Sequence, residues 1–187
     1  SNHAILHETL QAAGFHCDLF WDKSADELKR IIPEYDGLVI RSKFKIDKAI
    51  IDSAQKLKCI GRAGAGMENI DVTYAESKGI KCLHAPEGNA DAVAEHALGM
   101  LLMLFNNLKR ADEEVRKGLW LRHENRGVEV FGKTIGIIGY GNMGSAFAKR
   151  LQGFGCKVLV YDKFKEGFGN ETIIETNMQQ LYDECDI

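Results

Sequence analysis

The sequence predicts an α/β protein made of two domains, each built on a parallel sheet. Three observations support this fold class. Short apolar runs alternate strictly with segments of helical periodicity, glycine-rich loops follow two of the apolar runs, and one long helical segment separates the two halves. Such alternation favours parallel strands joined by right-handed helical crossovers.

The first half of the chain alternates helices with strands as far as Pro86. Helical spacing of apolar residues, with capping residues at the starts and glycines at the stops, predicts helices over residues 5–13, 24–32, 47–56 and 71–79. Apolar runs predict strands over residues 15–21, 37–41, 57–60 and 80–83.

The second half begins with a helical pattern over residues 90–117, longer than any before it and typical of a connector between domains. We expect residues 118–133 to form a loop with one short strand. A second strand-helix-strand unit is then predicted over residues 134–139, 145–152 and 157–161. The boundary is placed near residue 87, which gives domains 1–87 and 88–187.

The composition disfavours binding to nucleic acid or to a membrane. The net charge of −3 provides no surplus of cations for a general attraction to nucleic acid or to an anionic membrane. The longest apolar stretch, residues 97–105, is too short to cross a bilayer. The five cysteines are scattered without a CxxC pair, which predicts buried thiols in a reducing cytoplasm and disfavours a disulfide or a zinc site.

The clearest binding motif is the run TIGIIGYGNMG at residues 134–144, a buried strand that leads into three glycines and a helix. In a dinucleotide site Gly139 permits the tight turn, Gly141 lets the backbone approach a diphosphate, and Gly144 lets helix and strand pack closely. Amides at the start of the helix then face the phosphates.

The next strand ends in Asp162, 18 residues after Gly144, close to the spacing expected of a ribose-binding acid. Asp162 would accept hydrogen bonds from both adenosine ribose hydroxyls and repel a 2′-phosphate, which favours NAD over NADP. The positive charge of Lys163 beside it weakens the argument against NADP. The alternatives are a ligand-free glycine turn with a capping aspartate, and a domain that binds S-adenosylmethionine.

A second glycine-rich loop, GRAGAGMENID at residues 61–71, follows another predicted strand. Its backbone amides could hold a carboxylate, and Arg62 could add positive charge. Alone it would be only a turn. Together with NADAVAEH at 89–96, GLW at 118–120 and the dinucleotide motif, it resembles the D-isomer-specific 2-hydroxyacid dehydrogenases over essentially the whole chain.

This resemblance implies a flavodoxin-like substrate domain and a Rossmann NAD-binding domain, with hydride transfer between NAD and a D-2-hydroxy acid. It assigns the residues of two binding sites by motif. The substrate carboxylate would be held by the amides of Gly64, Ala65 and Gly66, and the cofactor would be contacted by Ala65, Asn142, Met143 and Asp162. Ala65 would lie near the nicotinamide, and it lacks the hydroxyl of the threonine often found at its position.

The segment RSKFK at residues 41–45 follows a predicted strand and is similar to the RSxxK segment of the phosphoglycerate dehydrogenases in this family. Arg41 and Lys45 would grip a substrate phosphate, with a solvated basic loop as the alternative. The favoured substrate is therefore D-3-phosphoglycerate, in serine biosynthesis. D-lactate, glycerate or hydroxypyruvate, and a non-enzymatic NADH-sensing corepressor, stay open. Family members imply a homodimer or homotetramer.

The resemblance also implies catalytic residues that lie outside this sequence. The family's arginine, glutamate and histidine come after the position of Ile187, and the family begins with a strand rather than a helix. We therefore expect a fragment in which both domains are truncated and which is inactive by itself. The remaining candidates for chemistry or cofactor contact are expected to be packing residues: His84, His96, Met100 and Met103.

Overall fold

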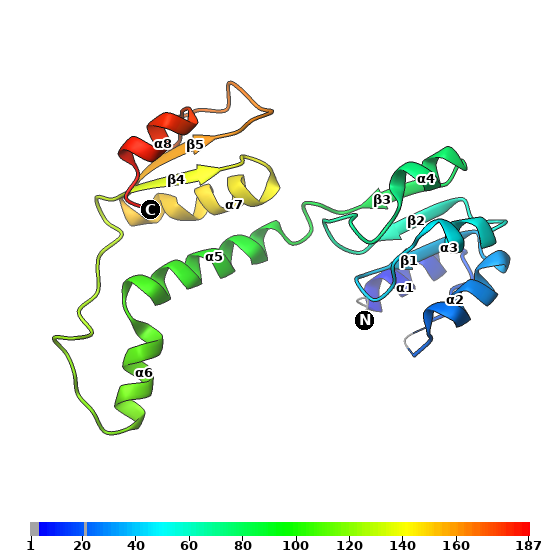
Figure 1. Ribbon diagram of the computed structural model, residues 1–187, viewed down its shortest axis with the longest axis horizontal. Coiled ribbons are helices and arrows are strands. Elements are labelled where there is room, and N and C mark those ends of the chain that lie inside the picture. Colours follow the sequence, from blue (N-terminus) through cyan, green and yellow to red (C-terminus); the bar gives the residue numbers. More distant parts are fainter. Residues whose placement is uncertain (1–3, 21) are drawn as a thin grey trace. The chain divides into compact units, whose positions relative to one another are not determined.

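The computed structural model describes residues 4–20 and 22–187. These residues form two compact units that divide between Gly88 and Asn89. The helices and strands of both units are labelled in Figure 1.

The first unit is built on a parallel sheet with strand order β1-β2-β3. Its strands are β1 (Gly37–Ile40), β2 (Cys59–Arg62) and β3 (Lys81–His84). Ile40 pairs with Arg62, which pairs in turn with His84. Because the strands are parallel and in register, the loops that follow them leave from the same edge of the sheet.

Four helices and one 3-10 turn accompany this sheet: α1 (Ala4–Ala12), α2 (Ala25–Ile31), η1 (Ile32–Glu34), α3 (Lys48–Ser53) and α4 (Val72–Ser77). The predicted caps explain three of the starts. Ser24 forms a capping box at α2, and the carboxylates of Asp47 and Asp71 each accept a backbone amide at 3.1 Å. Apart from α1, which has no buried residue, these elements pack on an apolar core around Ile46 and Ile60, both 0% exposed.

The strand predicted over residues 15–21 is wrong for its described part, residues 15–20; residue 21 lies outside the described residues. Residues 15–20 pair with no neighbouring strand in the described chain. Phe15 and Leu19 are 62% and 51% exposed. An apolar run forms a strand only where another strand accepts its backbone hydrogen bonds, and this run has none.

The second unit contains a parallel sheet with strand order β4-β5-β6. Its strands are β4 (Thr134–Ile138), β5 (Lys157–Tyr161) and β6 (Ile174–Glu175). Helices α7 (Asn142–Leu151), continued by the 3-10 turn η2 (Gln152–Phe154), and α8 (Met178–Glu184) lie on opposite sides of this sheet (Figure 1). The backbone of residues 186 and 187 also hydrogen-bonds to β4, at Thr134 and Gly136.

The single helix predicted over residues 90–117 is two helices, α5 (Ala90–Phe105) and α6 (Leu108–Arg116). The break lies at Asn107, which adopts a left-handed conformation with φ 51°. Asparagine tolerates this conformation, and asparagines favour helix ends over helix interiors. The Asn106 side chain also donates to the carbonyl of Leu102 at the end of α5. Periodicity alone did not reveal this interruption.

Helix α5 packs along α7 in the second unit (Figure 1). The Arg150 guanidinium joins the two helices by ion pairs of 3.0 Å to Asp91 and 2.9 Å to Glu95. The Arg150 side chain is only 20% exposed, whereas the side chains of Asp91 and Glu95 are 85% and 69% exposed. The contact ties the helix of the glycine-rich motif to its neighbour.

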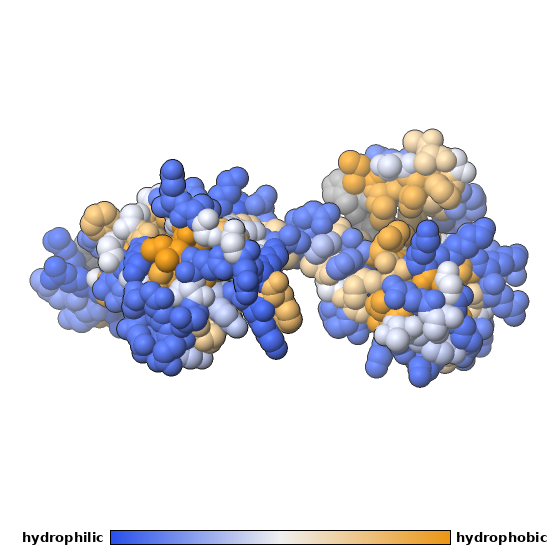
Figure 2. Space-filling model, turned by 90° about the horizontal axis from the view of Figure 1, so that it is seen from above, coloured by the Kyte–Doolittle hydropathy of each residue, from blue (hydrophilic) through white to orange (hydrophobic). Residues whose placement is uncertain are grey.

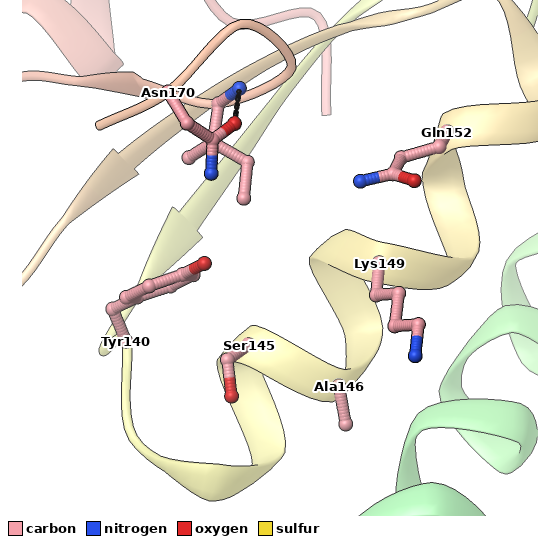
Figure 3. A pocket seen from close by; sticks show the side chains of 7 residues that line it. Tyr140, Ser145, Ala146, Lys149, Gln152 and Asn170 are labelled. Atoms are coloured by element: carbon pink, nitrogen blue, oxygen red, sulfur yellow. Dashed lines mark hydrogen bonds between the residues drawn. The ribbon is translucent and has the colours of Figure 1, made fainter. Parts of the chain in front are cut away.

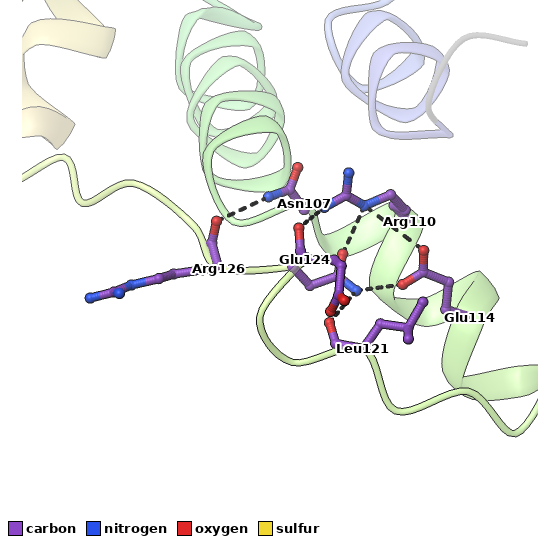
Figure 4. A network of polar contacts seen from close by, with 7 residues as sticks. Asn107, Arg110, Glu114, Leu121, Glu124 and Arg126 are labelled. Carbon is purple, nitrogen blue, oxygen red and sulfur yellow. Dashed lines mark hydrogen bonds and ion pairs between the residues drawn. The ribbon is translucent and has the colours of Figure 1, made fainter.

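Residues 118–133 form a loop, and the short strand predicted there is not present among them. A polar network holds this loop on α6 instead (Figure 4). Arg110 donates from Nε to the Asn125 side chain at 2.8 Å and from its guanidinium to the Glu124 carbonyl, and the Asn125 amide donates to Glu114. Side-chain hydrogen bonds to α6, rather than backbone hydrogen bonds to another strand, therefore hold this loop.

Several apolar side chains reach the surface, as the orange atoms in Figure 2 show. Met100 and Met103 are 45% and 39% exposed, so the prediction that they fill the core is wrong. All five cysteines are free and only partly buried, which corrects the expectation of buried thiols. Among the described residues, no helix has the length and apolar composition needed to cross a membrane.

Candidate functional site

The glycine motif of the second unit forms a tight turn between β4 and α7. Gly139 has φ 99°, a conformation that residues with a side chain rarely adopt. A β-carbon on Gly144 would overlap the carbonyl oxygen of Gly139 and lie 3.0 Å from its carbonyl carbon and 3.5 Å from Ile137 Cγ2. The helix therefore approaches the strand as closely as glycine permits.

Helix α7 leaves its first amides available to a ligand. It starts at Asn142, its N-cap is Gly141, and no side chain caps it. Its first backbone hydrogen bond runs from the Ser145 amide to the Gly141 carbonyl at 3.0 Å, so the amides of Asn142 and Met143 lack intrahelical partners. Nothing lies within 4 Å of the position of a β-carbon on Gly141. The space beside Gly141 is therefore open.

Asp162 lies immediately after β5 and connects the loops that follow both strands. Its Oδ1 accepts the amides of Phe164 at 2.7 Å and Lys165 at 3.0 Å, and its Oδ2 accepts the Tyr140 amide at 2.6 Å. The hydrogen bonds from Phe164 and then Tyr140 hold the pKa of this carboxyl below its usual range. A carboxylate has about four acceptor positions, so roughly one is left for a ligand.

A hollow of about 350 Å³ lies beside the same turn (Figure 3). It is lined by Tyr140, Ser145, Ala146, Lys149, Gln152, Asn170 and Ile173. The Tyr140 ring stacks on Phe168 with centroids 4.5 Å apart. The residues predicted to contact the diphosphate and ribose, Asn142, Met143 and Asp162, are absent from its lining, so this hollow is distinct from the predicted cofactor site.

In the first unit, the loop after β2 has its carbonyls engaged. The Arg62 carbonyl accepts the Gly64 amide at 2.8 Å, and the Ala63 carbonyl accepts Arg62 Nη1 at 3.0 Å. The Gly64 carbonyl accepts the Ala85 amide at 3.2 Å, and the Ala65 carbonyl lies 2.6 Å from His84 Nδ1. Four successive carbonyls, those of residues 62–65, are therefore already engaged within the protein.

The amides of Ala65 and Gly66, by contrast, donate no hydrogen bond to any described residue. In a trans peptide the N–H points opposite to the C=O of the preceding residue. Because the carbonyls of Gly64 and Ala65 both face residues 84 and 85, the amides of Ala65 and Gly66 both point away from the end of β3. Two adjacent amides that point the same way form a site for an anion.

Arg62 places positive charge next to these amides. Its Nε is buried without a hydrogen-bond partner among the described residues. A β-carbon on Gly64 would overlap Arg62 Nη1 and lie 3.0 Å from Cζ, so the guanidinium rests against the loop. An unpaired buried donor is costly unless a ligand or water satisfies it. The structure thus brings together Arg62, Gly64, Ala65 and Gly66 from the predicted substrate site.

Arg41 and Lys45 are exposed residues in the loop after β1. This loop is joined to the loop after β2 by the Asn69 side chain, which donates to the Ser42 carbonyl at 3.0 Å, and by the Ile46 amide, which donates to the Asn69 carbonyl at 2.7 Å. Both cations therefore lie in a loop that leaves the sheet from the same edge as the Gly64 loop.

A groove of about 550 Å³ runs beside Lys45. Its charged lining consists of two lysines and three acids: Lys45, Lys48, Asp47, Glu68 and Asp71. The carboxylate of Glu68 lies over Gly66, because a β-carbon on Gly66 would be 2.8 Å from Glu68 Cδ. Negative charge therefore borders the predicted substrate site on this side.

The two histidines expected to be packing residues are both exposed, so that prediction is wrong. His96 lies on α5, and His84 hydrogen-bonds to the glycine-rich loop. Sequence reasoning missed this contact. The available signal was that β2 and β3 are adjacent parallel strands, which brings the residues after each of them to one edge.

Two parallel-sheet units, one with a strand, glycine turn, helix, strand and terminal aspartate, define an α/β protein of the dinucleotide-binding type. The family described as "D-isomer specific 2-hydroxyacid dehydrogenase, catalytic domain" matches residues 2–185. The chain belongs to this family. The resemblance and the fold class predicted from the sequence are thereby confirmed.

Proteins similar to this chain are named for different reactions. Hydroxypyruvate reductase of Thermotoga maritima is 46% identical over 140 residues, or 75% of this chain and 46% of that protein. D-3-phosphoglycerate dehydrogenase of Archaeoglobus fulgidus is 40% identical over 151 residues, or 81% and 29%. A D-lactate dehydrogenase from Aquifex aeolicus, solved with NAD and lactic acid, gives a TM-score of 0.84 at 26% identity, covering 100% and 57%. The chain spans less than half the length of these two curated relatives.

Proposed function

We propose that this chain is the part of an NAD-dependent D-2-hydroxyacid dehydrogenase that holds the cofactor and the substrate carboxylate. Residues 88–187 would bind NAD, and residues 1–87 would bind the substrate. The observation that carries the proposal is the junction at Asp162, where an ionised carboxylate is fixed beside an uncapped helix start. These are the two groups that a dinucleotide requires from its protein.

When bound, NAD accepts the hydride that leaves C2 of the hydroxy acid. The chain's own residues would bind and orient. The amides of Asn142 and Met143 would hold the diphosphate, with Gly139, Gly141 and Gly144 shaping the turn. Asp162 would accept one ribose hydroxyl, since three of its acceptor positions are used within the protein, and its charge would repel a 2′-phosphate.

On the substrate side, the amides of Ala65 and Gly66, with the Arg62 guanidinium, would hold the carboxylate. The Gly64 amide is used within the loop and would not take part. Backbone amides suit this role because they are fixed before the substrate arrives and need no reorganisation. Ala65 would also lie near the nicotinamide, as in the family.

We favour D-3-phosphoglycerate as substrate, with Arg41 and Lys45 as phosphate ligands, because both cations share an edge with the Gly64 loop. A second candidate is hydroxypyruvate or D-glycerate. It is supported by the 46% identity to a hydroxypyruvate reductase and by Glu68, whose charge would oppose a phosphate in the groove. For the whole protein we propose a homodimer or homotetramer, since apolar side chains such as Trp120 and Phe131 are 80% and 72% exposed.

The test uses the whole protein, because the curated relatives extend well beyond the matched stretch. Formation of reduced nicotinamide is measured with NAD or NADP against D-3-phosphoglycerate, D-glycerate and D-lactate. We expect turnover with NAD and a kcat/KM for D-3-phosphoglycerate at least tenfold above that for the other acids. Preference for D-glycerate would select the second candidate. Binding of NADH without turnover of any acid would instead favour a corepressor of the same fold.

A further inference from the structure

We propose that His84 is a positioning residue that holds the Ala65–Gly66 peptide in its anion-accepting orientation. The inference rests on the carboxylate-binding role proposed above for this loop. His84 is the last residue of β3, and its ring Nδ1 lies 2.6 Å from the Ala65 carbonyl oxygen. This contact joins a side chain at the end of β3 to the backbone of the loop after β2.

The chemistry of this contact requires a proton on Nδ1 of the ring. A carbonyl oxygen only accepts hydrogen bonds, so Nδ1 must carry the proton and donate. Neutral imidazole protonated on Nδ1 meets that requirement, and so does imidazolium. The Ala65 carbonyl is thereby directed toward β3, and the amide of Gly66 in the same peptide plane is directed away from it.

Backbone hydrogen bonds hold the peptide before Ala65 but not the peptide between Ala65 and Gly66. The Gly64–Ala65 peptide is held by the Ala85 amide, which bonds to the Gly64 carbonyl at 3.2 Å. The Ala65–Gly66 peptide has no backbone hydrogen bond within the described chain. Glycines on both sides of Ala65 allow a wide range of backbone rotation. Without His84 the peptide could turn over, which would present the Ala65 carbonyl, rather than the Gly66 amide, to a carboxylate.

The position of His84 makes the inference testable. Its side chain is exposed, so its removal creates no cavity in the core. Asparagine carries an amide nitrogen at about the place of Nδ1 and can donate to the same carbonyl. Glutamine carries its amide one bond further out, near the place of Nε2. His84→Asn therefore keeps the hydrogen bond to the Ala65 carbonyl, whereas His84→Gln keeps a polar side chain but loses this hydrogen bond.

In the whole protein, His84→Ala should raise KM for both D-glycerate and D-3-phosphoglycerate about tenfold, as loss of one oriented donor would. Both acids should be affected, because both carry the carboxylate. The KM for NAD should not change. His84→Asn should restore the substrate KM to within about twofold of wild type, whereas His84→Gln should not. His16→Ala is the matched control, a histidine of the same unit whose side chain is 91% exposed.

A second measurement separates failure of this inference from failure of the proposed function. In protein labelled with ¹⁵N-glycine, the Gly66 amide resonance reports the orientation of the peptide without any substrate. We expect it to shift or broaden in His84→Ala and to return in His84→Asn. If it stays unchanged in His84→Ala, the positioning role is overturned, whatever the activity. If it changes while the KM values do not, His84 orients the loop and the carboxylate role of the loop is overturned instead.

Discussion

Replacement of Gly144 by alanine should separate the packing role of this glycine from the ligand-facing role of Gly141. At Gly144 the added methyl group would overlap the Gly139 carbonyl oxygen and lie 3.0 Å from its carbon. The obstructing atoms are backbone, so no side-chain rotation can relieve the clash. Either α7 moves away from β4 or the turn deforms.

The expected loss can be estimated from overpacking. Extra methyl groups forced into a well-packed site cost about 1–3 kcal/mol in the free energy of unfolding. Gly99, in the middle of α5, provides the opposite case, because nothing lies within 4 Å of its β-carbon position. There, alanine should stabilise by about 0.5–1 kcal/mol. The two variants should therefore differ by roughly 1.5–4 kcal/mol.

The assay is urea unfolding of the whole protein, followed by titration with NADH. Gly141→Ala is the third variant, since its β-carbon position is also empty. We expect Gly141→Ala to unfold like wild type but to bind NADH at least tenfold more weakly, because the methyl group occupies the side proposed for the diphosphate. The reasoning would be refuted if Gly144→Ala were as stable as Gly99→Ala, or if Gly141→Ala bound NADH normally.

Three further predictions concern charged groups. Asp162→Ser should narrow the preference for NAD over NADP tenfold or more in kcat/KM; an unchanged ratio would remove Asp162 from the cofactor site. Because the folded pKa of Asp162 is lowered, its contribution to stability is present above the ordinary aspartate pKa and is lost as the pH falls through the folded value. Acid unfolding should therefore depend less on pH in Asp162→Asn, and identical acid profiles would contradict this. Arg41→Ala should raise KM for D-3-phosphoglycerate at least tenfold and for D-glycerate little; equal losses would mean that Arg41 does not bind the phosphate.

The sequence predicted those elements whose cause is local. Ser24, Asp47 and Asp71 begin helices because a short acceptor side chain satisfies a free amide, and that pattern is visible without a structure. The turn at Gly139 and the close approach at Gly144 follow from spacing for the same reason. In each case one residue type meets a backbone requirement within a short stretch of sequence.

The errors arose where a partner far away in the sequence decides the outcome. Residues 15–20 have the apolar character of a strand but no neighbouring strand to pair with. Residues 118–133 are held by side chains of α6 rather than by a ladder. Met100 and Met103 follow helical periodicity, but other described residues cover their side chains only in part. Periodicity reports which residues are apolar and leaves open what covers them.

Both glycine-rich loops offer free backbone amides to a ligand, but the amides are free for different reasons. At the start of α7 the amides are free because the geometry of a helix leaves its first turn unpaired. In the loop after β2 no helix provides this. The amides of Ala65 and Gly66 are free because the carbonyls of Gly64 and Ala65, which share their peptide planes, are engaged by residues 84 and 85. The first arrangement depends on the backbone alone and is readable from glycine spacing. The second depends on His84, a side chain 18 residues beyond Gly66, so a substitution outside the motif should be able to disable it while leaving every glycine in place.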